Sequence, residues 1–118
     1  MLIVYGRISS ANVQKVRWIC NEGNLEFKTE IVGGKHGGLI SPEFKRLNPN
    51  STIPVLKDGD FILYESNAII KYLSDKFNVL KSENQEEIAL NNQWIDWSNS
   101  VFGLNCPNIE SRYPYRPA

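Results

Sequence analysis

The alternation of apolar and polar positions predicts a strand, a helix and a second strand at the start of the chain. Residues 2–5 are apolar and β-prone, which is typical of a buried strand. Over residues 12–22 apolar side chains recur at three- and four-residue spacing, and Ser9 and Ser10 just upstream are candidate N-caps of a helix. Residues 26–31 then alternate between polar and apolar, as in a strand with one solvated face. Since strand-helix-strand crossovers are nearly always right-handed with parallel strands, we expect such a unit here.

The segment that follows is rich in glycine. We expect residues 33–38 to lack regular structure, because glycine adds conformational freedom and little packing. Ser41 and Pro42 then form the pair that commonly opens a helix, with a capping hydroxyl and a proline at the first helical position. A short helix that ends near Asn48 is therefore predicted.

The pattern of the second half predicts an antiparallel hairpin followed by a helix. Apolar residues at 53–56 and 61–64 flank a turn that contains an Asp-Gly pair, which is a strong hairpin signal. Apolar residues then recur at helical spacing as far as residue 77, with Ser66 as the predicted N-cap. The predicted order is βαβ, a connector, and ββα.

A further amphipathic helix is predicted after a largely polar boundary at residues 78–84. From residue 85 to about residue 102 apolar side chains return at helical spacing. They include Ile88, Trp94, Ile95, Trp97, Val101 and Phe102. A face this apolar is seldom left exposed in a soluble monomer, so we expect self-association. Beyond Gly103 the sequence carries too many prolines for a helix, and we expect an irregular tail.

Composition and charge exclude several classes of function. Thirteen basic residues balance thirteen acidic ones with no run of like charge, so we expect no nucleic-acid partner and no membrane partner. The N-terminus lacks the features of a signal peptide or a membrane span, and we expect a cytoplasmic protein. Cys20 and Cys106 show no metal-like spacing and His36 is the single histidine, so we expect free structural thiols and no metal site.

Two short motifs carry candidate chemistry. Pro54 stands at the entrance of an apolar strand, where a proline removes a backbone donor and makes a cis peptide bond possible. The main chain of Ile53 would then be open to a ligand lying alongside, as at a peptide-binding edge. Glu65 and Ser66 stand at the entrance of the following helix. Taken singly, these residues have plainer interpretations, as a strand terminator, a surface charge and a helix cap, and a plain cap is the alternative for Ser10 as well.

Taken together, four blocks of the sequence resemble cytosolic glutathione transferases, in particular bacterial ones of the theta-like kind. The blocks are GRISSANVQKVRW (residues 6–18), LNPNSTIP (residues 47–54), LYESNAII (residues 63–70) and QWIDW (residues 93–97). The resemblance covers roughly residues 1–102. It implies an α/β fold, with a thioredoxin-like βαβ-ββα domain and a four-stranded mixed sheet over residues 1–78, and a linker over residues 79–84. Residues 85–118 would hold the first helix and the irregular tail of an incomplete, all-helical C-terminal domain.

The resemblance also implies which residues bind glutathione. Ile53, with Pro54 in the cis form, would pair its main chain with the cysteinyl part of the tripeptide. Glu65 and Ser66 would hold the γ-glutamyl end, because a helix N-terminus presents free N–H groups and a partial positive charge to a carboxylate. The glycine end would need hydrogen-bond donors, for which the weaker candidates are Lys35, His36 and Asn50.

At the end of the first strand, Ser10 aligns best with the family's catalytic hydroxyl, and Ser9 and Asn12 are close alternatives. A free thiol has a pKa of about 8.5, and a hydroxyl donor or a helix N-terminus favours its ionised form. The resemblance therefore implies that Ser10 stabilises the thiolate of glutathione, which is the nucleophile. Glutathione is a co-substrate that supplies the sulfur, so no metal and no internal Cys-x-x-Cys pair is required.

The implied function is attack by glutathione on a small hydrophobic electrophile, carried out by a homodimer. The alternatives are glutathione-dependent reduction of disulfides or peroxides at the same site, and a non-catalytic transferase-like module for protein association.

Two departures from the family bear on this choice. Gly23-Asn24 replaces the usual Leu-Gly pair, a minor change because asparagine tolerates left-handed geometry. The family's electrophile pocket is built mostly in the all-helical domain, of which this sequence holds the first helix.

Overall fold

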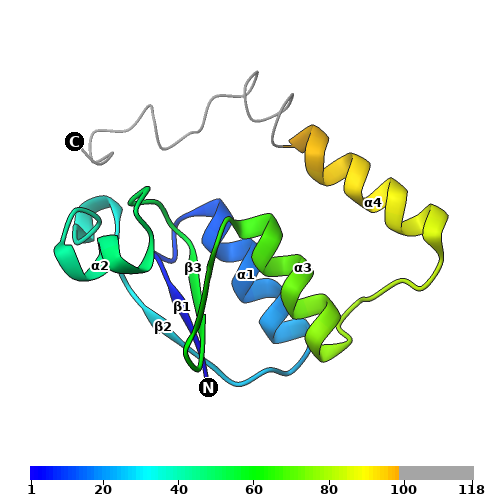
Figure 1. Cartoon of the computed structure of the whole chain (residues 1–118), viewed down its shortest axis with the longest axis horizontal. Helices are drawn as coiled ribbons and strands as arrows, with labels where there is room; N and C mark the ends of the chain where they lie inside the picture. The colour runs from blue at the N-terminus through cyan, green and yellow to red at the C-terminus, as the bar shows by residue number, and fades with distance from the viewer. Residues whose placement is uncertain (99–118) are drawn as a thin grey trace.

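The computed structural model describes residues 1–98 of the 118-residue chain (Figure 1). In chain order its elements are β1 (Leu2–Tyr5), α1 (Ala11–Glu22), β2 (Phe27–Glu30), the 3-10 helix η1 (Gly34–His36), α2 (Pro42–Leu47), β3 (Val55–Asp58), β4 (Phe61–Tyr64), α3 (Ser66–Phe77) and α4 (Gln85–Trp97). Within this described part, every helix falls short of the length and apolar character that a membrane span requires.

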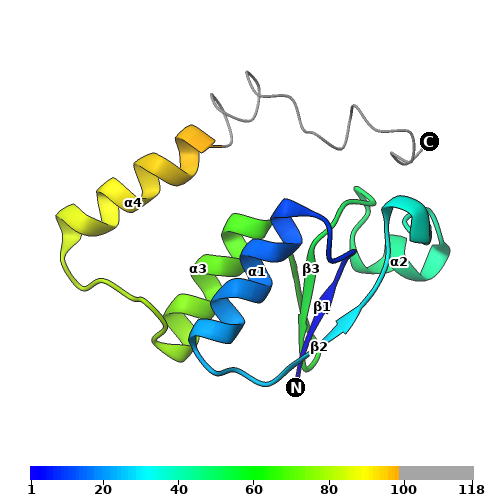
Figure 2. The same cartoon turned by 180° about the vertical axis from the view of Figure 1, so that it is seen from behind.

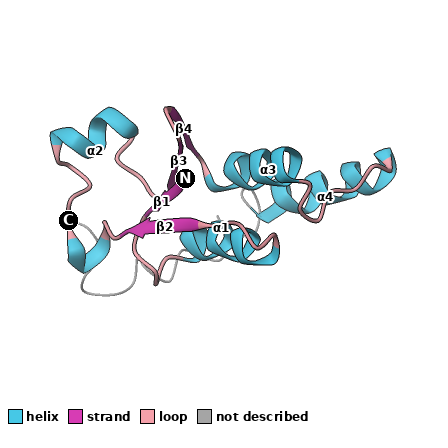
Figure 3. Ribbon diagram, turned by 90° about the horizontal axis from the view of Figure 1, so that it is seen from below, coloured by secondary structure: helices cyan, strands magenta, loops and turns pink. Residues whose placement is uncertain are grey.

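The four strands form one mixed sheet in the order β2-β1-β3-β4. β1 pairs in parallel with β2 and antiparallel with β3, and β3 pairs antiparallel with β4. The predicted βαβ unit and hairpin are therefore confirmed, the latter with Gly59 at a φ of 61° in its turn. α1 and α3 pack side by side on one face of the sheet, and α2 lies on the other side (Figure 1, Figure 2 and Figure 3).

The core lies between the sheet and the pair formed by α1 and α3. Its buried side chains include Leu2, Val4, Val13, Val16, Ile19, Leu56, Ile69 and Leu73. The two-residue period of β1 puts Leu2 and Val4 on the covered face, and the helical period of α1 does the same for Val13 and Val16. Burial of one such side chain is worth roughly 1.5–3 kcal/mol, so this layer fixes how the two helices lie on the sheet.

The core also includes one residue beyond α3. Val79 is 6 % exposed and belongs to the core cluster, although it is the first residue of the predicted linker. It lies against the end of α1, because a Cβ added at Gly23 would come within 2.4 Å of the Val79 Cγ2 atom. Asn24, which follows Gly23, takes a φ of 53°, as expected for asparagine at a left-handed position. The chain that leaves α3 is thus held against α1 before α4 begins.

Helix starts agree with the sequence prediction at two serines and differ at a third. Ser10 and Ser41 cap α1 and α2 as predicted. The prediction that Ser66 caps α3 is wrong, because Glu65 holds the cap position and Ser66 is the first helical residue. The reason is that a single residue links β4 to α3, and Glu65 makes this turn with a φ of 77°. No residue in an extended conformation is left to offer its side chain as a cap.

Two further segments differ from the sequence prediction. The glycine-rich segment contains the short helix η1, which is made by hydrogen bonds from His36 N to Gly33 O at 3.0 Å and from Gly37 N to Gly34 O at 3.3 Å. A 2.7 Å hydrogen bond from Gly33 N to Gly37 O closes the loop around it. The strand predicted from Ile53 begins at Val55 instead. The Ile53–Pro54 peptide bond is cis, as expected, and a proline provides no N–H group to the ladder.

α4 begins at Gln85 as predicted and is described as far as Trp97. The rest of the predicted helix, to residue 102, and the predicted irregular tail lie outside the described residues. α4 buries none of its residues, and Leu90, Trp94 and Trp97 are exposed. In Figure 1 and Figure 2 the helix stands apart from α1 and α3. The described part of the predicted apolar face is therefore exposed or half-buried.

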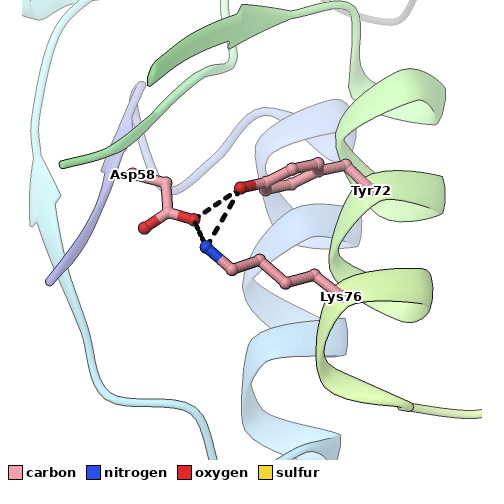
Figure 4. A network of polar contacts seen from close by, with 3 residues as sticks. All are labelled: Asp58, Tyr72 and Lys76. Atoms are coloured by element: carbon pink, nitrogen blue, oxygen red, sulfur yellow. Dashed lines mark hydrogen bonds and ion pairs between the residues drawn. The ribbon is translucent and has the colours of Figure 1, made fainter. Parts of the chain in front are cut away.

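A polar cluster ties the hairpin to α3 (Figure 4). The Tyr72 hydroxyl donates to Asp58 Oδ2 at 2.6 Å, and Lys76 Nζ lies 2.5 Å from the same oxygen. Hydrogen bonds from Lys76 and Tyr72 hold the pKa of the Asp58 carboxyl below its usual value, and the bond to Asp58 raises the pKa of Lys76 and of Tyr72. A depressed carboxyl pKa stabilises the fold above the unfolded pKa, whereas raised lysine and tyrosine pKa values stabilise it below theirs. The cluster therefore supports the fold in the neutral range and loses strength as the pH falls through the folded pKa of Asp58.

We expect Asp58→Asn to lower the melting temperature at neutral pH by about 2–5 °C, the effect of losing a charged hydrogen-bond acceptor in a small domain. The deficit should shrink below about pH 4, where protonation of Asp58 removes its contribution from the wild type as well. Thermal unfolding followed by circular dichroism at acid and neutral pH measures both effects. Asp60→Asn, at an exposed position in the same turn, is the matched control and should show no such deficit. A deficit for Asp58→Asn that stays constant into the acid range would contradict this account.

Candidate functional site

Segments from both halves of the sequence meet at one edge of the sheet, the upper edge in Figure 1. The strand register pairs Tyr5 of β1 with Val55 of β3, and Val55 with Tyr64 of β4. The end of β1, the approach to β3 and the end of β4 therefore lie together, and α1 and α3 start from this edge. A 3.5 Å hydrogen bond from Ser66 Oγ to Asn12 Oδ1 joins the two helix starts. We call this region, made of residues 5–12, 53–55 and 64–67, the site edge.

The main chain of Ile53 offers free hydrogen-bonding groups at the site edge. Within residues 1–98 neither its N–H nor its C=O takes part in a hydrogen bond, because the pairing of β3 with β1 begins only at Val55. Its side chain packs against Gly6, where an added Cβ would come within 3.3 Å of Ile53 Cβ and 2.3 Å of Val13 Cγ2. Only glycine fits at this close approach, which brings β1, α1 and Ile53 together.

The start of α3 differs from those of the other described α-helices. Side chains cap α1, α2 and α4, whereas no side chain caps α3. Ser66 is buried at this start, and Glu65 is exposed. The φ of 77° and ψ of 111° at Glu65 lie in a region that costs a residue other than glycine roughly 1–3 kcal/mol, and such strain is common at ligand-binding positions. An uncapped helix start suits a carboxylate, and the Glu65 side chain can accept from an ammonium group.

The three candidates for the thiol site occupy different environments at the start of α1. Ser10 is buried, and its Oγ accepts a hydrogen bond from Val13 N at 3.4 Å, so the hydroxyl proton can still be donated to a ligand. Ser9 and Asn12 are exposed. Asn12 makes the contact with Ser66 and thereby connects the start of α1 to that of α3.

A cavity of about 420 Å³ opens beside Ser9. It is lined by Arg7, Ile8, Ser9, Gln14, Ile31, Lys35 and His36. Two of the candidates for the glycine end, Lys35 and His36, thus share a cavity with Ser9, whereas the third, Asn50, does not line it and is exposed. Sequence patterns do not identify Arg7 and Ile8 as site residues. The signal that could have identified them is their position in the connection between the first strand and the first helix, where the other candidates for the thiol site also lie.

Two ionisable side chains of α1 have shifted pKa values. Burial lowers the pKa of Lys15, whose ammonium donates to Asn67 Oδ1 on α3 at 3.2 Å. Burial raises the pKa of the Cys20 thiol to about 11, against a smaller opposing effect of Arg17. Cys20 is therefore protonated at neutral pH and is no nucleophile, and Cys106 lies outside the described residues. The described part of the chain holds no group of three or more His, Cys, Asp or Glu side chains suited to a metal ion.

Comparison with known proteins places these features in a family. Residues 4–85 match the family model of the glutathione S-transferase N-terminal domain. The chain is 34 % identical over 105 residues to glutathione S-transferase GstB of Escherichia coli K12, with 86 % of this chain and 50 % of that protein covered. It is 32 % identical over 99 residues to the disulfide-bond oxidoreductase YfcG of the same organism, with 78 % of this chain and 46 % of that protein covered. The chain thus spans about half the length of these curated relatives.

A solved structure agrees with the fold. The theta class glutathione S-transferase of Xanthomonas axonopodis pv. citri, with glutathione bound, matches with a TM-score of 0.83 and 38 % identity, over 86 % of this chain and 50 % of that one. The four-stranded mixed sheet with its βαβ-ββα order is the thioredoxin-like fold that the resemblance implied. The family model covers α1, α2, α3 and all of the sheet except the first residues of β1. These elements together build the site edge. On these grounds the chain belongs to the glutathione S-transferase family, through its thioredoxin-like N-terminal domain.

Proposed function

We propose that this chain binds glutathione along the site edge and activates its thiol. The observation that carries the proposal is the free main chain of Ile53, which lies at the same edge as the uncapped start of α3. A peptide backbone pairs with such an edge as an added strand does, through its own N–H and C=O groups. The glutathione bound to the Xanthomonas relative supports the choice of ligand.

Each end of glutathione has a chemically suitable counterpart. The γ-glutamyl carboxylate accepts hydrogen bonds from the first N–H groups of α3 and from the Ser66 hydroxyl, which gives up its 3.5 Å bond to Asn12 Oδ1 for this purpose. Glu65 accepts from the adjacent ammonium. The cysteinyl part pairs with Ile53, next to Pro54. The glycine carboxylate is assigned to the donors Lys35, His36 and Asn50.

The sulfur of glutathione is directed towards the start of α1. The Ser10 O–H donates a hydrogen bond to the sulfur, because the hydroxyl oxygen already accepts one from Val13 N and its proton is left for the ligand. A hydrogen bond to the charged form and the partial positive charge of the helix start both favour the thiolate. Ser9, on the cavity wall, and Asn12 are the alternative partners of the sulfur.

The thiolate then attacks a small hydrophobic electrophile, forming a carbon–sulfur bond as the leaving group departs. Ile8 and Ile31 give the cavity beside Ser9 an apolar wall for such a molecule. A homodimer is part of the proposal, since α4 leaves Leu90 and Trp94 exposed. A cytoplasmic location stays a prediction.

Glutathione-dependent disulfide reduction is a second candidate, favoured by the similarity to the oxidoreductase YfcG. In that case glutathione again supplies the thiolate, because Cys20, the one cysteine within residues 1–98, is buried and protonated. A wild-type chain that binds glutathione but turns over neither electrophiles nor disulfides would be a non-catalytic binding module. Steady-state assays with both substrate classes separate these cases.

We expect Ser66→Ala to weaken the binding of reduced glutathione by about 10- to 100-fold, because the carboxylate loses a hydroxyl donor in a partly buried site. Isothermal titration calorimetry measures the change. Ser41→Ala is the matched control, since it removes a serine at the start of α2, outside the proposed site. It should lower stability and leave the affinity for glutathione unchanged. Equal affinity of Ser66→Ala and wild type would remove Ser66 from the site.

We expect Ser10→Ala to raise the pKa of the bound glutathione thiol towards its free value and to lower kcat/KM at neutral pH by about 10- to 100-fold. The pH dependence of kcat/KM with a chlorodinitrobenzene electrophile measures both effects. Ser10→Thr keeps a hydroxyl and a capping oxygen, and should retain most of the activity. A wild-type pH profile for Ser10→Ala would transfer the role to Ser9 or Asn12, whose alanine variants then decide between them.

A further inference from the structure

Asn48 is a fully buried polar side chain with no part in the chemistry proposed above. It follows α2 directly and is 0 % exposed. Burying an amide is unfavourable unless its donors and its acceptor find partners. The hydrogen bonds of this side chain therefore indicate which part of the structure it supports.

All the hydrogen bonds of the Asn48 side chain reach the loop between α2 and β3. Its Nδ2 donates to Thr52 O at 2.9 Å and to Thr52 Oγ1 at 3.0 Å. Its Oδ1 accepts from Asn50 N at 2.9 Å. One side chain thus supplies the partners that a helix or a sheet would otherwise give to this stretch of backbone.

Among the residues that the structure describes, the hydrogen bonds of residues 49–53 all run to Asn48. Ser51 takes a left-handed φ of 55° and donates its N–H to Asn48 O at 2.9 Å. A serine in this region has no intrinsic preference for it, so surrounding contacts must hold it there. Asn48 provides these contacts through both its main chain and its side chain.

The bond to Thr52 O bears directly on Ile53. The peptide unit from Thr52 to Ile53 is planar and trans, so its C=O and N–H groups point in opposite directions. Asn48 Nδ2 draws the carbonyl of Thr52 towards the buried side of the loop. The N–H of Ile53 is thereby turned the other way, and it makes no hydrogen bond among the residues that the structure describes.

We infer that Asn48 is a positioning residue of the glutathione site, which fixes the direction in which Ile53 presents its N–H to the cysteinyl part of the ligand. It acts through Thr52 and does not touch the ligand. This inference rests on the proposed function, and it adds a residue outside the site edge to the groups that determine affinity.

Two substitutions separate the bonds of Asn48. Asn48→Ala removes all of them, whereas Asn48→Asp keeps an acceptor for Asn50 N and loses both donations to Thr52. Both variants of the full chain should bind reduced glutathione about tenfold more weakly or worse, because both release the Thr52 carbonyl. Amide hydrogen exchange gives a second measurement. Exchange at Asn50 N should rise about tenfold in Asn48→Ala and stay near the wild-type rate in Asn48→Asp.

Val16→Ala is the control for general destabilisation, since it opens a cavity in the core without touching the loop. It should lower the melting temperature while glutathione affinity stays within about twofold of wild type. Wild-type affinity in a folded Asn48→Asp variant would overturn the inference. So would an equal loss of affinity in Val16→Ala at the same loss of stability, because Asn48 would then act through the stability of the fold alone.

If neither Asn48 variant folds, Asn48→Ser and the wild type decide. In Asn48→Ser the hydroxyl can replace one of the hydrogen bonds of the Asn48 amide. This variant should therefore bind glutathione more weakly than wild type, but still measurably. In the wild type, glutathione should slow exchange of the Asn48 side-chain amide together with that of Ile53 N, and an effect on neither overturns the inference. A wild type that binds no glutathione overturns the proposed function instead, and the exchange at Asn50 and Ile53 in Asn48→Ser, compared with wild type, then decides whether Asn48 holds this loop.

Discussion

The single-residue connection between β4 and α3 is the constraint on which the candidate site depends. Glu65 alone turns the chain from strand to helix, and its φ of 77° costs roughly 1–3 kcal/mol. Burial of Ile69 and Leu73 on the inner face of α3 offsets this cost, since each contributes roughly 1.5–3 kcal/mol. The same short turn leaves no residue to cap the helix. Backbone strain, an uncapped helix start and the position of Ser66 therefore have one common cause.

The sequence predicts elements well where the apolar period is long and the residues at the ends mark a start or a stop. α1 and the hairpin of β3 and β4 belong to this group, with Ser10 and Gly59 as the marks. Prediction fails where a neighbouring segment decides the end of an element. β3 begins at Val55 because β1, its partner, has ended at Tyr5, and η1 forms through main-chain bonds that no side-chain period reveals.

The candidate site residues could be named from the order and spacing of the motifs, but the contacts that hold them could not. The bond between Asn12 and Ser66 joins two helix starts and depends on how α1 packs against α3 in the core. The bonds of Asn48 depend on the path of the loop before β3. A polar residue whose partners are set by tertiary packing leaves no periodic trace in the sequence, so its function becomes visible only in the folded chain.

Val79 gives the fold a mechanical property that the element boundaries conceal. The polar composition from residue 78 suggests that the packed unit ends with α3, yet the core continues to Val79, which rests against Gly23 at the far end of α1. α1 thus has the site edge at its first turn and the anchor of the following segment at its last. A load that α4 receives through its exposed face therefore passes first through residues 80–84, which lack regular structure, and meets the packed core at Val79, beside the last turn of α1.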